Sequence, residues 1–584
     1  MIALTAGALA VSVVSPAAAK APSTRFDAPH RDDNLPSRLG DKQADLKQTA
    51  QALVLNGQAS TKGANKVVKV AKGQYVELAQ EGQDEILTLL GEFGNQIHPV
   101  TGGTAGPLHN QIPQPNRAVD NTTLWQPDYD TAYYESILFD KTHVPSMANW
   151  YLEQSSGRYT VDGYVSNWVQ VPYNEARYGT DLCGSIVCST VWDFLKAQAN
   201  AWWAELVADK GEQGAKDFLA GFDKWDRYDY NGNGNFNEPD GYIDHFQSIH
   251  AGEGEETGGG AQGEDAIWSH RWYAFQNLIG SVGPHGFGGF QIGDSGVWVG
   301  DYTIEPENGG VGVFAHEFGH DLGLPDEYDT SGNVGGAENG TGWWTNWSQG
   351  SYGTIDQNGL GDYPVSMDSW EKFELGWLNY EAYGPGQHAS TKVGPVEANT
   401  KQAQAAILVL PPKTLVKELG TPHSGSNFYY SGTANNLDTF MTKQVTLPSG
   451  TPSLSAYVRY NIEQDWDYAY VVVSTDNGAH WTTIHTDRST NTNPNSQNKG
   501  EGITGVQGSW GTVTANLSAY AGQTVLLGFE YWTDVAQQGT PGATQTPGFQ
   551  IDDISMTGQP ADGAETDGGW TFTQSAGTGF HESA

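Results

Sequence analysis

The sequence predicts a multidomain α+β protein in which a mixed helix-and-strand enzyme domain is followed by a β-sandwich. Its 584 residues are too many for a single hydrophobic core. Helical periodicity is concentrated in the first two thirds of the chain, whereas short apolar segments between Asn, Asp and Gly turns dominate the last third. With 11% aromatic residues and 74 Gly, the composition is typical of an extracellular globular protein and not of a disordered one.

The charge balance excludes one class of partner. There are 29 Lys and Arg against 68 Asp and Glu, which gives a formal net charge of −39. Such a surface repels phosphate backbones, so we expect no nucleic-acid partner. It suits a soluble exported protein and offers many carboxylates for calcium.

The N-terminus carries the marks of export. Residues 1–19 are apolar and end in Ala17-Ala18-Ala19, a small-residue cleavage pattern that predicts a signal peptide. The alternative is a buried N-terminal strand. No other segment is long and apolar enough to be transmembrane, so we expect a secreted, extracellular protein. Residues 20–71 are polar, and the helical pattern over 41–59 fits either a removable pro-segment or a helical N-terminal lobe.

The next segment, 72–410, is predicted to be the catalytic domain. Residues 85–93 read as a buried strand, and 190–210 and 212–225 are helical by periodicity. Pro411-Pro412 marks the following boundary, after which 411–424 begin a β domain. The sandwich is predicted from strands at 456–463, 468–485, 524–532 and 549–556. Residues 558–584 are Gly-rich and acidic and are predicted to be a tail.

The main chemistry lies in the segment VGVFAHEFGHDLGLPDEYD. His316 and His320 are four residues apart, which on a helix places both imidazoles on one face, where they can bind one zinc ion. Glu317 beside them can reach the attacking water and act as general base. This predicts a zinc-dependent hydrolase. The alternatives are a surface helix with two solvated histidines and a metal site without catalysis.

The third ligand is predicted from the end of the helix. Gly323 and Pro325 stop the helix and turn the chain back toward the metal, so Asp326 is the favoured ligand. Glu371, on a predicted helix downstream, is the rival. Tyr328 is a candidate donor to a tetrahedral oxyanion, or else a packed aromatic residue.

A calcium loop is predicted upstream. Asp229, Asn231, Asn233 and Asp240 follow the spacing of an EF-hand loop, with Gly234 at the sharp turn, although no clear pair of flanking helices surrounds them. The alternative is a hydrated Asn/Gly turn. A second calcium site in the C-terminal region would draw on Asp465, Asp467, Asp552 and Asp553, for which solvated strand ends are an equal alternative.

Only two cysteines occur, Cys183 and Cys188. An exported protein favours a disulfide that closes this small loop. A pair of metal thiolates and two free thiols are the alternatives.

Three motifs carry a resemblance to a known family. HEFGHDLGLPDEYD, DRYDYNGNGNFNEPDGYIDHF and SMDSWEKFELGWL resemble the immune inhibitor A family of secreted bacterial zinc metallopeptidases. The resemblance implies a pro-peptide, a zincin-like catalytic domain and endopeptidase activity on proteins. It also implies a jelly-roll, MAM-like sandwich at 425–557, inserted in a host β domain of which 558–584 would be a truncated second part. Finally, it implies that the pro-peptide holds the enzyme latent by occupying the cleft.

The same resemblance makes His316 and His320 zinc ligands and Glu317 the catalytic acid/base, and places the loop that begins at Asp229 in a calcium-rich segment. One stretch departs from the family pattern, because Asn346–Ser351 stand where relatives tend to show Met-Ser-Ser-Gly-Ser. The floor of the metal site is therefore expected to differ. The competing hypotheses are a secreted binding or adhesion protein with an inert zinc site and, with no local motif behind it, a glycosidase.

Overall fold

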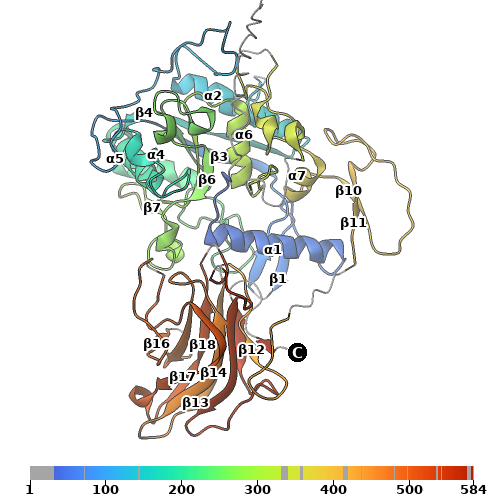
Figure 1. The fold of residues 1–584 in the computed structure, drawn as a ribbon. Coiled ribbons are helices and arrows are strands. Elements are labelled where there is room, and N and C mark those ends of the chain that lie inside the picture. The colour runs from blue at the N-terminus through green and yellow to red at the C-terminus, as the bar shows by residue number, and fades with distance from the viewer. Residues whose placement is uncertain are drawn as a thin grey trace, which may run out of the picture.

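The computed structural model describes residues 32–582, apart from 72, 143–144, 331–339, 356–358, 412–417, 436, 479, 496, 535–536, 541 and 575–580. A mixed helix-and-strand body forms one part of the molecule, and a β-sandwich forms the other (Figure 1). The predicted signal peptide lies outside the described residues. None of the described helices is long and apolar enough to cross a membrane.

The predicted N-terminal helix is present as α1. The elements here are α1 (Arg38–Leu55), β1 (Val68–Ala71) and β2 (Gln74–Val76). Ser37 caps α1 by accepting the N–H of Gly40 at 3.1 Å. On the other side, Lys47 and Gln51 lie 3.7 and 2.9 Å from the carboxylate of Glu374, so α1 is tied to the body that carries the metal helix.

A five-stranded sheet organises the main body. Its strands are β3 (Gly82–Glu92), β4 (Tyr159–Gln170), β5 (Phe246–His250), β6 (His270–Tyr273) and β9 (Asp301–Pro306), in the order β4-β3-β5-β9-β6. All pairs are parallel except β6–β9. The predicted strand over 85–93 is β3. Leu87 and Leu89 face one core, while Ile86 and Leu90 face another, as the two-residue period of a strand requires.

Helices cover both faces of this sheet. They are α2 (Thr131–Phe139), α3 (Met147–Gln154), α4 (Ala176–Gly179), α5 (Val191–Leu219), α6 (Val311–Asp321) and α7 (Ser369–Glu374). Side chains of α5 fill one core, and those of α2, α3 and α6 fill the other. The two helices predicted over 190–210 and 212–225 are the two halves of α5, which breaks at Gly211, where φ is 71°.

The remaining elements of the body are short. The strand pairs are β7 (Phe290–Gln291) with β8 (Trp298–Val299), and β10 (Tyr380–Tyr383) with β11 (Ala405–Leu408). Among the described residues, the 3-10 turns are η2 (Ala220–Phe222), η3 (Glu255–Thr257), η4 (Gly263–Asp265), η5 (Gln276–Leu278), η6 (Pro284–Gly286), η8 (Gly342–Trp344), η9 (Gln349–Tyr352) and η10 (Ser518–Tyr520).

The C-terminal part is a sandwich of two five-stranded sheets around one apolar core. One sheet has the order β17-β14-β19-β12-β21 and the other β16-β15-β18-β13-β20. The strands are β12 (Tyr429–Tyr430), β13 (Asp438–Thr446), β14 (Ser453–Asn461), β15 (Tyr468–Ser474), β16 (Thr482–Ile484), β17 (Val506–Asn516), β18 (Thr524–Trp532), β19 (Gly548–Met556), β20 (Thr571–Gln574) and β21 (His581–Glu582).

The segment 558–584, which was predicted to be a tail, contains two strands of the sandwich among its described residues. β20 pairs with β13 and β21 pairs with β12, so this segment completes both sheets. The strands are very short, with Phe572 as the apolar contact of β20 to the core, which is why their pattern in the sequence is weak.

Arg38 connects α1 with the sandwich. Its guanidinium lies 4.0 Å from Asp438 and 5.1 Å from the ring centre of Trp532. The N-terminal segment therefore contacts both the catalytic body and the sandwich.

Candidate active site and metal centre

The two histidines of α6 converge on one point. The Nε2 atoms of His316 and His320 lie 3.0 Å apart, and both side chains are buried. Their Nδ1 atoms lie 2.7 Å from the backbone carbonyls of Asn346 and Leu324, respectively. Because a carbonyl only accepts, Nδ1 carries the proton in each ring and the Nε2 lone pairs face each other. That is the arrangement of two imidazoles that share a metal ion.

Asp326 completes this arrangement. The chain turns back after α6 through Gly323, where φ is 96°, and Asp326 Oδ1 then lies 3.4 Å from His316 Nε2 and 3.3 Å from His320 Nε2. Neither oxygen of Asp326 accepts a hydrogen bond within the described part of the chain. A buried carboxylate without donors beside two Nε2 lone pairs fits a divalent metal.

The rival ligand, Glu371, lies elsewhere. It is fully buried and accepts the hydroxyl of Thr345 and the N–H of Asp368, with which it forms the capping box of α7. The structure brings Asp326, not Glu371, to the histidines.

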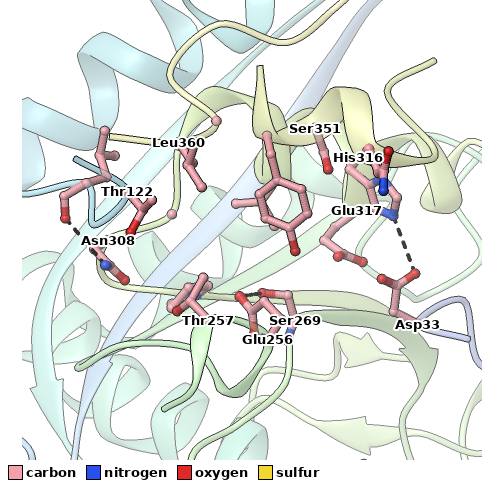
Figure 2. Close-up of a pocket in the computed structure, with 18 of the residues that line it drawn as sticks. Asp33, Thr122, Glu256, Thr257, Ser269, Asn308, His316, Glu317, Ser351 and Leu360 are labelled. Atoms are coloured by element: carbon pink, nitrogen blue, oxygen red, sulfur yellow. Dashed lines mark hydrogen bonds and ion pairs between the residues drawn. The ribbon is translucent and has the colours of Figure 1, made fainter. Parts of the chain in front are cut away.

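A fourth candidate ligand atom comes from the N-terminal segment. Asp33 Oδ1 lies 3.4 Å from His316 Nε2 and 3.1 Å from His320 Nε2, and the side chain points at His316 in Figure 2. Backbone hydrogen bonds with Arg271 of β6 hold this segment, at 2.8 Å from Arg271 N to Asp33 O and 2.9 Å from Leu35 N to Arg271 O. One ligand atom from each of Asp33, His316, His320 and Asp326 lies within 4.8 Å of the others. The sequence offered no local signal for Asp33.

Glu317 lies in the cleft beside this cluster. Its side chain is buried, and one of its oxygens, Oε2, has no hydrogen-bond partner among the described residues. Burial raises the pKa of Glu317 well above its usual range, and the charge of Asp33 raises it further. Residues from several distant segments line the cleft, and Figure 2 shows among them Thr122, Glu256, Thr257, Ser269, Asn308 and Leu360.

The indole of Trp347 packs against His316. Trp347 is fully buried, its ring stacks 6.3 Å from that of His316, and its Nε1 donates to the carbonyl of His316 at 3.0 Å. Gly319 of α6 faces this ring so closely that an added Cβ would lie 2.5 Å from Trp347 Cε2. The absence of a side chain at Gly319 therefore makes room for the ring of Trp347, which in turn supports the position of His316.

Known family profiles match both parts of the chain. The profile described as immune inhibitor A peptidase M6, catalytic domain, matches residues 72–378, and the profile described as immune inhibitor A-like, MAM domain, matches 389–579. The chain belongs to the immune inhibitor A family.

Two relatives in this family are similar along most of the chain. The pre-pro-metalloprotease PrtV of Vibrio cholerae serotype O1 is 32% identical over 546 residues, which is 88% of this chain and 52% of the relative. Immune inhibitor A of Bacillus thuringiensis subsp. alesti is 32% identical over 529 residues, 85% of this chain and 67% of the relative. The chain thus spans about half the length of PrtV. The predicted order, a mixed catalytic domain followed by a MAM domain, is confirmed.

The segment DRYDYNGNGNFNEPDGYIDHF contacts the C-terminal end of α6. Arg227 lies 2.9 Å from Asp321, the last residue of α6, and 3.7 Å from Asp301 of β9. His245 Nδ1 lies 2.5 Å from the same Asp321. Although burial lowers it, the pKa of His245 rises to about 9 because Asp321 and Asp84 pair with the ring. This buried network holds the end of α6 that carries His320.

In the predicted calcium loop, the asparagine side chains gather around Glu238 and not around Asp240. Asp229 Oδ1 accepts the N–H groups of Asn233 and Gly234 at 3.0 and 2.9 Å. The amides of Asn231, Asn233 and Asn235 donate to Glu238 at 2.7, 2.8 and 2.7 Å. Asp240 instead accepts the N–H of Tyr242 at 2.9 Å, and burial raises the pKa of Asp240 to about 8. The loop therefore brings Asp229, Asn231 and Asn233 together with Glu238.

The four acids predicted for the C-terminal region separate into two places. Asp552 accepts the N–H groups of His423 and Ser424, and Asp553 bonds their side chains. Asp467 lies in another cluster, with Glu463 and Asp534. Asp465, with a φ of 66°, accepts a hydrogen bond from Gln464.

Cys183 and Cys188 are joined in a disulfide, with their Cα atoms 5.8 Å apart. The bridge closes a short loop between α4 and α5. The sulfurs thus lie in a short covalent loop and not in one of the metal-type clusters of the described chain.

Proposed function

We propose that this chain is a secreted zinc-dependent endopeptidase that hydrolyses peptide bonds of extracellular proteins. The convergence of the Nε2 atoms of His316 and His320 on the carboxylate of Asp326, beside buried Glu317, carries the proposal. Membership in the immune inhibitor A peptidase family supports it. The fold of the catalytic part is proposed to be zincin-like, and the sandwich a jelly-roll.

His316, His320 and Asp326 are the residues proposed to hold the zinc ion. When bound, zinc would supply Lewis-acid polarisation of the scissile carbonyl and would acidify the attacking water. The backbone acceptors of the two Nδ1–H groups orient both rings before the metal binds.

Glu317 is the proposed general base and acid. It takes the proton of the attacking water and passes it to the leaving amine. Tyr328 lines the same cleft. Burial, with the charge of Asp33 second, raises the pKa of Tyr328 far above its usual value, so its hydroxyl stays protonated and is available as a donor to the oxyanion.

The segment 20–71 is proposed to be a pro-peptide that keeps the enzyme latent. Catalytic zinc requires one open position for water. Asp33 Oδ1 lies 3.1 Å from His320 Nε2 and therefore stands where that water would bind. Removal of the segment would open the position and take a negative charge away from Glu317. Residues 1–19 are proposed to be the signal peptide, 72–410 the catalytic domain and 425–557 the MAM-like core of the sandwich.

Casein digestion by the processed protein tests the proposal. Wild type should digest casein, and both Glu317→Ala and a zinc chelator should abolish digestion. Glu317→Ala should retain its zinc, because the side chain is not among the proposed ligands. Digestion by Glu317→Ala at the wild-type rate would refute the proposal. Failure of a processed, zinc-loaded wild type to cleave casein or a mixed peptide library would favour the alternative, a secreted binding protein with an inert zinc site.

A further inference from the structure

Three carboxylates converge at one end of the sandwich, far from the active site in sequence. They belong to Glu463, Asp467 and Asp534, and one oxygen of each lies within 4.8 Å of the others. Glu463 and Asp467 lie in the turn between β14 and β15, and Asp534 follows β18.

The register of two strands creates this cluster. β15 and β18 are antiparallel neighbours, with Tyr468 opposite Trp532. The residue before Tyr468 and the residues after Trp532 are therefore adjacent in space, and Asp467 Oδ1 accepts the N–H of Asp534 at 2.9 Å. The two acids are 67 residues apart in the sequence, so only the pairing brings them together.

The carboxylate of Asp467 is buried, and only one of its two oxygens accepts a hydrogen bond among the described residues. The side chain of Asp467 is 0% exposed, and its Oδ2 has no hydrogen-bond partner among the described residues. Among the described residues, no lysine, arginine or histidine forms an ion pair with Asp467 or Glu463. Glu463 accepts a hydrogen bond from the side-chain amide of Gln537 at 3.0 Å. A buried carboxylate with one oxygen unsatisfied and no ion-paired cation is strongly unfavourable, so Asp467 needs a cation or must bind a proton. Arg38 interacts electrostatically with Asp534.

The raised pKa values of Asp467 and Glu463 agree with this lack of a partner cation. Burial, followed by the charges of Asp534 and Glu463, raises the pKa of Asp467 to about 9. Burial and Asp534 likewise raise the pKa of Glu463 to about 7. No helix begins here, so capping does not account for the acids, in contrast to Asp368 and Glu371 at α7.

We propose that Glu463, Asp467 and Asp534 bind a calcium ion. All three donors are hard oxygens with no nitrogen or sulfur among them, which favours calcium over zinc. The ligands come from an irregular turn and a strand end, which suits the flexible coordination of calcium better than the strict octahedron of magnesium. The ion would link the β14–β15 turn to the end of β18 and so stabilise this end of the sandwich.

The test uses the full-length, zinc-loaded protein with Glu317→Ala, which prevents self-digestion. Calcium binding is measured by isothermal titration, and Tb³⁺ luminescence excited through aromatic residues and displaced by calcium serves as a second readout. Asp467→Asn is the test variant and Asp465→Asn, in the same turn but outside the cluster, is the matched control. Asp229→Asn reports separately on the loop of the catalytic domain.

We expect Asp467→Asn to lose one calcium site, or to bind there at least about tenfold more weakly, while Asp465→Asn matches the parent. Without calcium, Asp467→Asn should unfold at the same or a higher temperature than the parent, because it removes one of three repelling charges. With calcium, the order should invert. Glu463→Gln, at a partly exposed position, should behave in the same way and covers the case in which Asp467→Asn does not fold. Parent-like stoichiometry and affinity in both variants would overturn the proposal, and so would a parent whose only calcium site is lost in Asp229→Asn.

Discussion

Gly319→Ala should displace His316, a proposed zinc ligand, by pushing on the indole ring of Trp347 that packs against it. The added Cβ would lie 2.5 Å from Trp347 Cε2 and 2.8 Å from Nε1. Trp347 Cζ2 is the closest atom and would overlap the added Cβ. Because an ordinary carbon–carbon contact is about 3.5 Å, relief requires a movement of more than about 1 Å. Trp347 is fully buried and donates to the carbonyl of His316, so the movement is transmitted to that ligand.

Overpacking of this kind costs about 1–3 kcal/mol of unfolding free energy. A displacement of about 1 Å at the reacting groups lowers turnover by about 100-fold. The assays are urea unfolding in the Glu317→Ala background and hydrolysis of a fluorogenic peptide by the processed enzyme. Each is run with Gly319→Ala alone, Trp347→Phe alone and both together.

The double variant is decisive. Phe lacks the indole atoms that the new Cβ would strike, so Gly319→Ala should cost much less in the Trp347→Phe background than in wild type, with a coupling of about 1 kcal/mol or more. Equal costs in the two backgrounds would refute the claim that this pair sets the floor of the metal centre.

Three further predictions concern the surroundings of the site. Asp33→Ala in the uncleaved protein should raise peptide hydrolysis at least about tenfold, because the water position is opened; unchanged latency would exclude Asp33 as the blocking group. Asp326→Ala should lose zinc by elemental analysis, whereas Glu371→Gln should keep zinc and lose only about 1 kcal/mol of stability with its capping box; the reverse pattern would make Glu371 the ligand. Arg227→Met should destabilise the protein by about 3–5 kcal/mol in urea, because it removes the guanidinium that pairs with buried Asp321 and Asp301 and leaves His245 to pair with Asp321; a loss below about 1 kcal/mol would show that the network does not brace α6.

Local patterns in the sequence predicted what depends on neighbours along the chain. The four-residue spacing of His316 and His320 predicts two rings on one helix face, and the Gly323 turn predicts the return of Asp326. Short apolar segments between Asn, Asp and Gly turns likewise predicted the strands of the sandwich. These features follow from helix and strand periods and need no knowledge of tertiary structure.

Features made by distant segments escaped the same reasoning. Asp33 reaches the centre from 283 residues before His316, through backbone pairing with β6. Asp534 meets Asp467 only because β15 and β18 pair in one register. Trp347 could be suspected from the missing methionine, but its fit against Gly319 depends on how α6 packs. Short strands such as β20 lacked a pattern long enough to detect.

Anomalous diffraction at the zinc absorption edge, from crystals of the full-length protein with Glu317→Ala, tests the central claim most directly. The account predicts one strong peak within about 2.0–2.2 Å of His316 Nε2, His320 Nε2 and an oxygen of Asp326. A peak elsewhere, or no peak between two rings that point apart, would contradict it.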